Sequence, residues 1–371
     1  MKTIFFIILL KIPITMNAQK TTFIVGTTDR NLEEAVAIYH LDEKTGDMEL
    51  FKRTKGGTRP GYLALSNDKH FLFAVSSKNF EGLEKEQSIN AFRINDEVSE
   101  LSHINQQPSR GKNPTHISVN PVYDIVYAAN YSNGSVVSYA FDKNGRLTPP
   151  LSSFQHKGSG PNDDRQKGPH AHYIHASMNG KYVYSADLGI DKIMIYKQKK
   201  NGEITPNGKH EFLQLEPGSG PRHMAFHANG EWVFILTELS NEVVACEINN
   251  ENGSLEIIDK KSTLDVDPSA YTKAAAIRIH PNGKYLYASN RGVNSIAVFE
   301  IMDDGRLTSM GNYFEDIGVV RDFNISPSGK YLVAGNQDQN EIVLLKINED
   351  GSLQTTGKTL PVSQPSCVIF Y

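Results

Sequence analysis

Short apolar runs separated by polar turns recur along the whole chain, and one combination of them repeats about every fifty residues. In this combination an apolar strand leads through a Pro/Asn-Gly turn into a second apolar strand. The clearest copies are Ile279–Tyr287, Ile325–Val333, Ala176–Tyr184 and Phe226–Phe234, and two degenerate copies end at Phe73 and Tyr127. Successive copies end 54, 57, 50, 53 and 46 residues apart, which indicates a chain built from one repeated unit.

Each unit continues in the same way after its second strand. A polar turn leads to a third apolar segment such as Ser295–Phe299, and an Asp-Gly or Asn-Gly turn leads to a fourth. Such turns supply the positive φ that tight antiparallel hairpins need. Four antiparallel strands in about fifty residues make one propeller blade, and no segment keeps the 3.6-residue period of a helix. The pattern therefore predicts an all-β fold with few helices.

The two ends of the chain are expected to complete a seventh blade. Thr22–Gly26 resembles the second strand of a unit that lacks its first strand, and Pro365–Tyr371 resembles a first strand that lacks its second. Joining the two pairs strand edges that would otherwise be open. We therefore predict a seven-bladed β-propeller in which the N- and C-terminal strands share one blade, with residues 19–371 as a single domain.

Two positions of the repeat are expected to meet at one mouth of the central channel. The first strand of each blade lines the channel, and its start lies beside the end of the antiparallel second strand. Twelve residues before the end of each copy stand Gly61, Thr115, His172, Arg222, Ala275 and Arg321, and four residues after it stand Ser77, Tyr131, Leu188, Glu238, Arg291 and Gln337. These residues differ from blade to blade, as expected of a functional rim.

The charged members of this rim predict a site for a small anion. Arg222, Arg291 and Arg321 carry guanidinium groups, which bind carboxylates or phosphates through paired hydrogen bonds. His172 and Glu238 can transfer protons beside them. Two alternatives remain open at this point. Arg222 and Glu238 could simply pair with each other, and an arginine-lined rim could serve a propeller that only binds another protein.

Two histidines at alternate positions add to this rim. His170 and His172 stand at the head of a channel-lining strand, and imidazole is the usual general acid or base near neutral pH. A His-x-His pair could also bind a metal, but no Cys or carboxylate stands at a matching spacing, so we expect no metal. Asp187 and Asn290 are further candidate substrate contacts, although a polar residue stands at their position in every unit, which is typical of a structural turn.

Charge and composition bear on partners and location. The net charge is −4 and the basic residues are dispersed, so we expect no nucleic-acid partner. Residues 1–18 have the layout of a signal peptide, with Lys2, an apolar run over Ile4–Leu10 and Ala18 at a cleavage point. We expect a periplasmic or secreted protein if this leader is cleaved, with no membrane contact after cleavage, and a cytoplasmic protein otherwise.

Several motifs, in order and at blade spacing, resemble those of the propeller-type 6-phosphogluconolactonases. They are Gly168-Pro169-His170-Ala171-His172, Ala186-Asp187-Leu188-Gly189, Gly220-Pro221-Arg222-His223, Thr237-Glu238-Leu239 and Ser289-Asn290-Arg291-Gly292. The fungal 3-carboxy-cis,cis-muconate lactonising enzymes are related and share the fold. The resemblance implies a hydrolase that opens a sugar lactone, 6-phosphoglucono-1,5-lactone, to its acid without a cofactor.

The resemblance also implies which residues act. The active-site set proposed for the muconate branch is one His, two Arg and one Glu, and it matches His172, Arg222, Arg291 and Glu238 in this sequence. The expected substrate contacts are His170, His223, Arg321, Asp187 and Asn290. In this hypothesis the arginines hold the anionic group and neutralise charge on the carbonyl oxygen. Either the histidine or the glutamate activates water, and its partner returns the proton.

Other functions remain open at this stage. The same rim could serve a lactonising cyclase of the muconate type, and the fold also hosts non-catalytic propellers that bind a ligand or a protein. An exported protein would not meet the cytoplasmic phosphorylated lactone. Export would therefore point to another small anionic lactone or sugar acid as the substrate.

Overall fold

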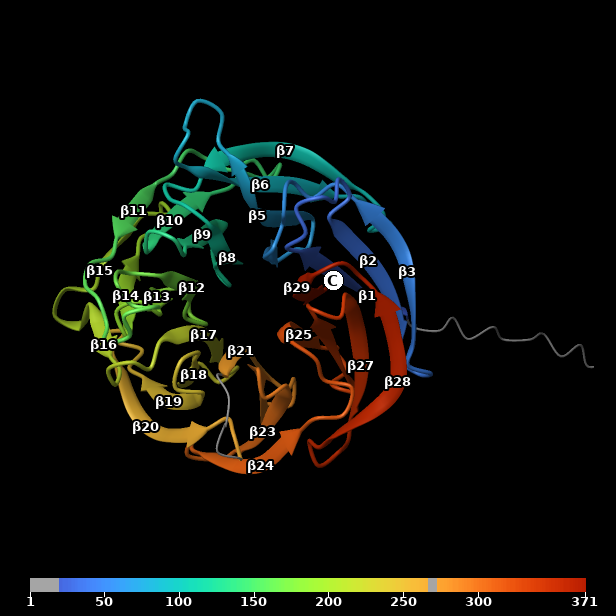
Figure 1. The fold of residues 1–371 in the computed structure, drawn as a ribbon. Helices are drawn as coiled ribbons and strands as arrows, with labels where there is room; N and C mark the ends of the chain where they lie inside the picture. The colour runs from blue at the N-terminus through green and yellow to red at the C-terminus, as the bar shows by residue number, and fades with distance from the viewer. Residues whose placement is uncertain (1–19, 266–271) are drawn as a thin grey trace, which may run out of the picture.

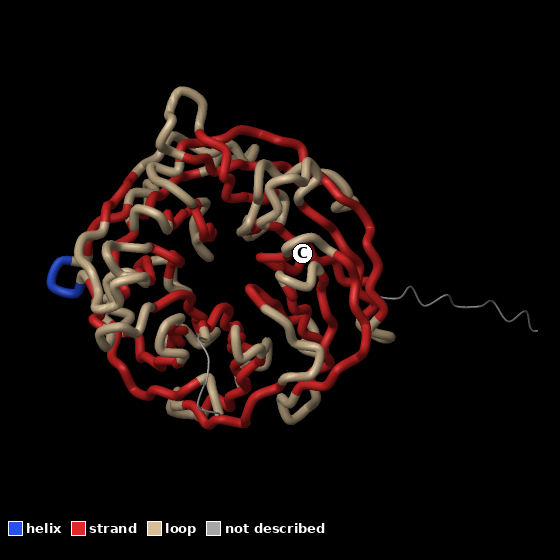
Figure 2. The backbone as a smooth tube through the Cα atoms, viewed as in Figure 1, coloured by secondary structure: helices blue, strands red, loops and turns tan. Residues whose placement is uncertain are grey.

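Seven β-sheets surround a central channel in the computed structural model, which describes residues 20–265 and 272–371 (Figure 1). Six sheets have four strands and one has five. Strands dominate the backbone, and the single helix of the described part is a 3-10 turn, Gly208–His210 (Figure 2). The prediction of an all-β, seven-bladed propeller is confirmed.

The first three blades in chain order begin with the blade that closes the ring. Its strands are β29 (Pro365–Phe370), β1 (Lys20–Thr27), β2 (Val36–Asp42) and β3 (Asp47–Thr54). The second blade has β4 (Leu63–Leu65), β5 (Phe71–Asn79), β6 (Gln87–Ile94) and β7 (Leu101–Pro108). The third has β8 (Pro114–Val119), β9 (Ile125–Asn130), β10 (Ser135–Ala140) and β11 (Ser152–Gln155).

The remaining four blades follow the same inner-to-outer order. The fourth has β12 (Ala171–Ala176), β13 (Tyr182–Asp187), β14 (Lys192–Gln198), β15 (Ile204–Pro206) and β16 (Phe212–Gln214). The fifth has β17 (Pro221–Phe226), β18 (Trp232–Thr237), β19 (Glu242–Ile248) and β20 (Leu255–Ser262). The sixth has β21 (Lys273–Ile279), β22 (Tyr285–Arg291), β23 (Ser295–Ile301) and β24 (Leu307–Tyr313), and the seventh has β25 (Val320–Ile325), β26 (Tyr331–Asn336), β27 (Glu341–Ile347) and β28 (Leu353–Pro361).

The two ends of the chain close the ring as the repeat pattern predicts. β29 pairs antiparallel with β1 over Phe23 to Thr27, so the C-terminal strand is the innermost strand of the N-terminal blade (Figure 1). Edge strands with free hydrogen-bonding groups are thereby paired. Residues 1–18 lie outside the described residues, so the leader peptide stays a prediction. No helix among the described residues has the length and hydropathy needed to cross a membrane.

The hydrophobic core lies between the faces of neighbouring blades. Phe23 and Val25 of β1, for example, pack with Val333 of β26 and Leu344 of β27, and all four side chains are buried. Burying such a side chain contributes about 1.5–3 kcal/mol. Because each blade supplies two apolar faces, the strands alternate little between apolar and polar residues near the channel, which explains why β9 and β13 are buried along their whole length.

Five of the inner strands carry a β-bulge at the same place near their first residue. The ladder with the second strand skips one residue in four blades and two in the sixth. The skipped residues are Thr115, His172, Arg222, Ala275 with Ala276, and Arg321. A bulge releases a residue from the ladder and redirects its side chain, and bulges are frequent beside active sites. Of the six rim positions counted twelve residues before the end of each copy, all but Gly61 are thus bulged positions of the fold.

Candidate active site

Glu238 is the centre of an ion-pair cluster at one mouth of the channel. It directly follows β18 and is only 3% exposed. Its Oε2 atom lies 3.0 Å from Nε of Arg222 and 3.2 Å from Nη2 of Arg291. Its Oε1 atom lies 2.7 Å from Nη2 of Arg165. The structure therefore brings together the predicted Arg222, Glu238 and Arg291, and Glu238 binds three guanidiniums rather than Arg222 alone.

The cluster fixes the charge of Glu238. Burial alone would raise the pKa of its carboxyl, but Arg291 and Arg222 outweigh burial and hold the pKa well below its usual range. Burial and the neighbouring Arg291 lower the pKa of Arg222 to about 9, so the guanidinium stays charged near neutral pH. Arg222 also donates from Nη1 to the carbonyl oxygen of Ala275. The ionised carboxylate is thus a fixed counter-ion that orients the arginines.

His172 lies beside this cluster as a buried, neutral imidazole. Its ring is 5.2 Å from the ring of His223 and 5.5 Å from that of Tyr131. Burial and the charge of Arg222 lower its pKa well below the ordinary value of 6.5. Its Nδ1 atom is enclosed without a hydrogen-bond partner among the described residues. A neutral imidazole with an unused nitrogen can accept a proton from a bound water.

The channel histidines should make the protein unstable in acid. Burial lowers the pKa values of His116, His172, His175 and His223 in the folded state. Below pH 6.5 the unfolded chain binds protons that the folded chain does not, so stability falls as pH falls, by up to about 1.4 kcal/mol per pH unit for each histidine. Urea unfolding between pH 7 and pH 5 should show a steep drop in the midpoint.

Two variants check the cause of this pH dependence. His175→Gln should remove about one histidine's share of the slope, and His175→Gln combined with His116→Gln should remove about two. A midpoint that stays constant between pH 7 and pH 5 would contradict the prediction.

The other side of the mouth carries two arginines that have no carboxylate partner among residues 20–265 and 272–371. Arg321 and Arg59 line a small polar cavity together with Gly61 and Thr115. Nε of Arg59 donates to the carbonyl oxygen of Thr28 at 3.0 Å. Arg321 forms no ion pair or hydrogen bond within residues 20–265 and 272–371, and burial together with Arg291 lowers its pKa to about 10. Both guanidiniums are therefore available to an anion.

The remaining predicted contacts lie at the same mouth but are mostly occupied. Asp187 is fully buried; its Oδ2 atom lies 2.6 Å from Nδ1 of His156, and its Oδ1 atom accepts from the backbone N–H of His170. The side-chain amide of Asn290 accepts a hydrogen bond from the hydroxyl of Thr263 and donates one to the carbonyl oxygen of the same residue. These bonds favour the structural role that a polar residue in every repeat suggested. His170 is more available, because its ring stacks on Tyr131 and only Nδ1 is engaged.

Sequence reasoning missed two arginines of the site. Arg165 comes from the loop between β11 and β12, and its Nη2 atom bridges Glu238 and the hydroxyl of Tyr131. Arg59 comes from the loop before β4, where it adopts a positive φ of 54°. Neither stands at a repeat position. The spacing of 57 residues between Tyr127 and Tyr184 is the longest of the five, and this extra length was the one signal that pointed to the loop of Arg165.

The ligand types of a metal centre are not gathered in the described part of the chain. No group of three or more His, Cys, Asp or Glu side chains there is arranged to hold a metal ion. The charged groups described above are instead three guanidiniums that pair with the carboxylate of Glu238, of Arg165, Arg222 and Arg291, and two more beside them, of Arg59 and Arg321. This excess of positive charge favours a negatively charged ligand.

Comparison with known proteins defines the family. The model of the family described as "Lactonase, 7-bladed beta-propeller" matches residues 22–370. The chain therefore belongs to this lactonase family, as its motifs predict, and the expected class of enzyme, a lactone hydrolase, is confirmed with it.

Individual relatives carry more specific names. A 6-phosphogluconolactonase of Bacillus subtilis is 34% identical over 277 residues, covering 75% of this chain and 76% of that protein. One of Formosa agariphila is 31% identical over 296 residues, covering 78% and 82%. A crystal structure from Bacteroides fragilis, of a protein proposed to be a 6-phosphogluconolactonase, has a TM-score of 0.87 at 29% identity and covers 97% of this chain and 99% of that one.

Proposed function

We propose that this protein hydrolyses a small, negatively charged sugar lactone to its open-chain acid at the arginine-rich mouth. The observation that carries the proposal is the grouping of a neutral His172 with guanidiniums that Glu238 holds in place. The names of the relatives from Bacillus subtilis and Formosa agariphila support a sugar lactone as the substrate class.

In the proposed reaction His172 is the general base. It takes a proton from a water whose oxygen attacks the lactone carbonyl carbon. Arg222 or Arg291 stabilises the negative charge that develops on the carbonyl oxygen. The bond between the carbonyl carbon and the ring oxygen then breaks, and protonated His172 returns its proton to the leaving oxygen. Glu238 is not the base in this scheme, because three guanidiniums keep it ionised and engaged.

The anionic group of the substrate has a natural position in this scheme. Arg321 and Arg59 face a polar cavity beside the catalytic cluster and have no carboxylate partner among the described residues. A phosphate or carboxylate placed there would gain charge-assisted hydrogen bonds, each worth about 1.5–3 kcal/mol. The lactone carbonyl would then point toward Arg222 and His172.

The direct test is lactone opening by the purified protein. Acid release from D-glucono-1,5-lactone and from its 6-phosphate is followed with a pH indicator, and spontaneous hydrolysis is subtracted. We expect saturable turnover, with the phosphorylated lactone preferred. Absence of turnover above background on both lactones, as in a propeller that only binds a partner, would contradict the proposal.

Replacing Arg321 should separate binding of the charged group from catalysis. Arg321→Ala is expected to raise KM for the phosphorylated lactone by about tenfold or more, because it removes one charge-assisted hydrogen bond. KM for the uncharged lactone should change little, since that substrate has no group for Arg321. The matched control is Arg306→Ala, which removes an exposed guanidinium near Asp304. Equal effects of Arg321→Ala on both lactones would remove Arg321 from the anion site.

A further inference from the structure

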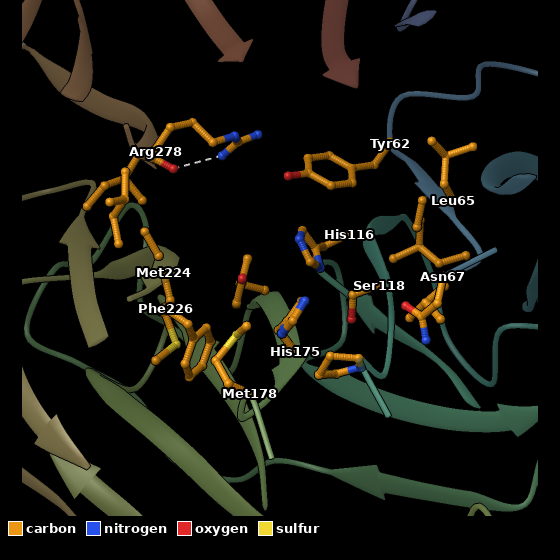
Figure 3. A pocket seen from close by; sticks show the side chains of 18 residues that line it. Tyr62, Leu65, Asn67, His116, Ser118, His175, Met178, Met224, Phe226 and Arg278 are labelled. Carbon is orange, nitrogen blue, oxygen red and sulfur yellow. Dashed lines mark hydrogen bonds between the residues drawn. The ribbon is translucent and has the colours of Figure 1, made fainter. Parts of the chain in front are cut away.

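A second cavity lies at the end of the channel opposite the arginine-rich mouth (Figure 3). Its volume is about 520 Å³, which is in the range of pockets for small molecules. The inner strands β4, β8, β12, β17 and β21 line it with their middle and last residues, whereas His172 and Arg222, near the starts of β12 and β17, belong to the candidate active site. The two ends of the channel therefore present different chemistry.

A layer of aromatic and imidazole rings separates the two ends. The ring of His116 lies 4.4 Å from that of Tyr62 and 4.1 Å from that of Tyr173. His223, whose Nε2 atom lies 3.2 Å from Nη1 of Arg222, is between 5.6 and 5.7 Å from all three rings. His223 thus belongs to the side of the active site, while the other three rings also line the second cavity.

The deep end of this cavity is rich in hydrogen-bond donors. The hydroxyls of Tyr62 and Tyr173 form no hydrogen bond within the part of the chain that the structure describes, although these residues are only 9% and 7% exposed. Nδ1 of His116 accepts from the backbone N–H of Ile174 at 3.3 Å, which places the ring proton on Nε2. Neither hydroxyl is among the fully enclosed polar atoms of the described residues, so both can donate to a ligand in the cavity.

Arg278 adds a charge to these donors. It is the single Lys, Arg, Asp or Glu among the residues that line the cavity. Its Nη2 atom lies 2.7 Å from Oδ1 of Asp322 and its Nη1 atom donates to the carbonyl oxygen of Ile277 at 2.8 Å. A guanidinium carries five N–H groups, and these two bonds do not use all of them. The others can donate to a ligand. In Figure 3 the hydroxyl of Tyr62 points toward this guanidinium.

The outer walls of the cavity are mostly apolar, with Asn67, Ser118 and His175 as polar members. Leu65, Met178, Met224, Phe226 and Ile279 line it (Figure 3). Methionine side chains adapt to ligands of different shape. From the donor-rich floor and the apolar walls, we propose that this cavity binds a small carboxylic acid with an apolar body, whose carboxylate meets Arg278 and the tyrosine hydroxyls. The site is separate from the proposed lactone site.

Binding of 2-naphthoate, compared with its neutral counterpart 2-naphthamide, tests the proposal by isothermal titration calorimetry. We expect one saturable site with a Kd of about 1 mM or tighter, and binding of the amide at least about tenfold weaker. The double variant Arg278→Gln with Asp322→Asn removes both charges together and should abolish the preference for the acid. Tyr62→Phe with Tyr173→Phe keeps the ion pair, provides a second test if the first variant fails to fold, and should weaken binding by about tenfold.

A variant at the other mouth locates the binding. Arg321→Ala should leave the Kd of 2-naphthoate unchanged, because Arg321 lies at the opposite end of the channel. The proposal is overturned if no saturable binding occurs, if the amide binds as tightly as the acid, or if Arg321→Ala abolishes binding. These outcomes are independent of the lactone assay, so failure here and failure of the proposed function are distinguishable.

Discussion

His172→Asn is expected to lower kcat/KM for lactone hydrolysis by about 10²–10⁴-fold, the usual contribution of a general base. Asparagine keeps a polar side chain in the buried space but cannot take up the proton of water. The wild-type profile of kcat/KM against pH should stay flat between about pH 6.5 and pH 8, fall in more acidic solution, and fall again above about pH 9, where Arg222 loses its charge. The direction of this acid-side change follows from the lowered pKa of His172. The imidazole stays unprotonated until the pH falls well below 6.5, the ordinary pKa of histidine.

The control for this experiment is a histidine outside the channel. His103→Gln changes a side chain on the outer strand β7 and should leave kcat/KM unaltered. Circular dichroism and urea unfolding establish that both variants are folded. A His172→Asn enzyme within a few-fold of wild-type activity would exclude His172 as the base and return attention to the other groups of the mouth.

Glu238→Gln should destabilise the fold by about 3–5 kcal/mol, the usual loss when one partner of a buried ion pair is removed. Glutamine leaves Arg222, Arg291 and Arg165 without their shared counter-ion in a buried cluster. The arginines should then separate, so activity should fall with stability. Urea unfolding at pH 7 measures the loss, and the lactone assay on the folded fraction measures the effect on turnover.

Two further variants show whether charge is the cause. Glu242→Gln removes a carboxylate of the same blade that pairs with Lys260 near the surface, where such pairs contribute about 0–1 kcal/mol. Combining Glu238→Gln with Arg291→Gln should restore part of the stability, because a cation that paired with the lost carboxylate is removed as well. If Glu238→Gln lost no more stability than Glu242→Gln, the cluster would not be the electrostatic centre that its distances indicate.

The repeat made the fold predictable from the sequence, because every blade uses the same turns at the same spacing. Gly305 illustrates this: its φ is +78°, and a Cβ atom there would lie 2.8 Å from Trp232 of the neighbouring blade. The same turn glycine therefore serves both the hairpin and the packing between blades. A glycine that both the hairpin and the packing require is a strong sequence signal for a turn. The order of the strands could therefore be predicted from the positions of such glycines.

The site was only partly predictable, for a physical reason. His172, Arg222 and Arg321 stand at repeat positions, so counting along the repeat predicts one common location for them, and all three are bulged residues near the starts of inner strands. Arg165 and Arg59 stand in loops whose course depends on tertiary contacts, such as the bond from Arg165 to Tyr131. No periodicity describes a loop, and the pairing of three guanidiniums with one carboxylate is a matter of side-chain geometry rather than of order along the chain.

The bulges at the starts of the inner strands affect how such a protein can acquire a new substrate preference. A residue that has left the hydrogen-bond ladder can be exchanged without altering the pairing of its neighbours. Thr115 and Arg321, which are partly exposed at two of these bulges, are therefore positions where selectivity can be redesigned one side chain at a time. Five of the seven blades place such a replaceable residue at the mouth, and the pairing of the strands around it stays the same.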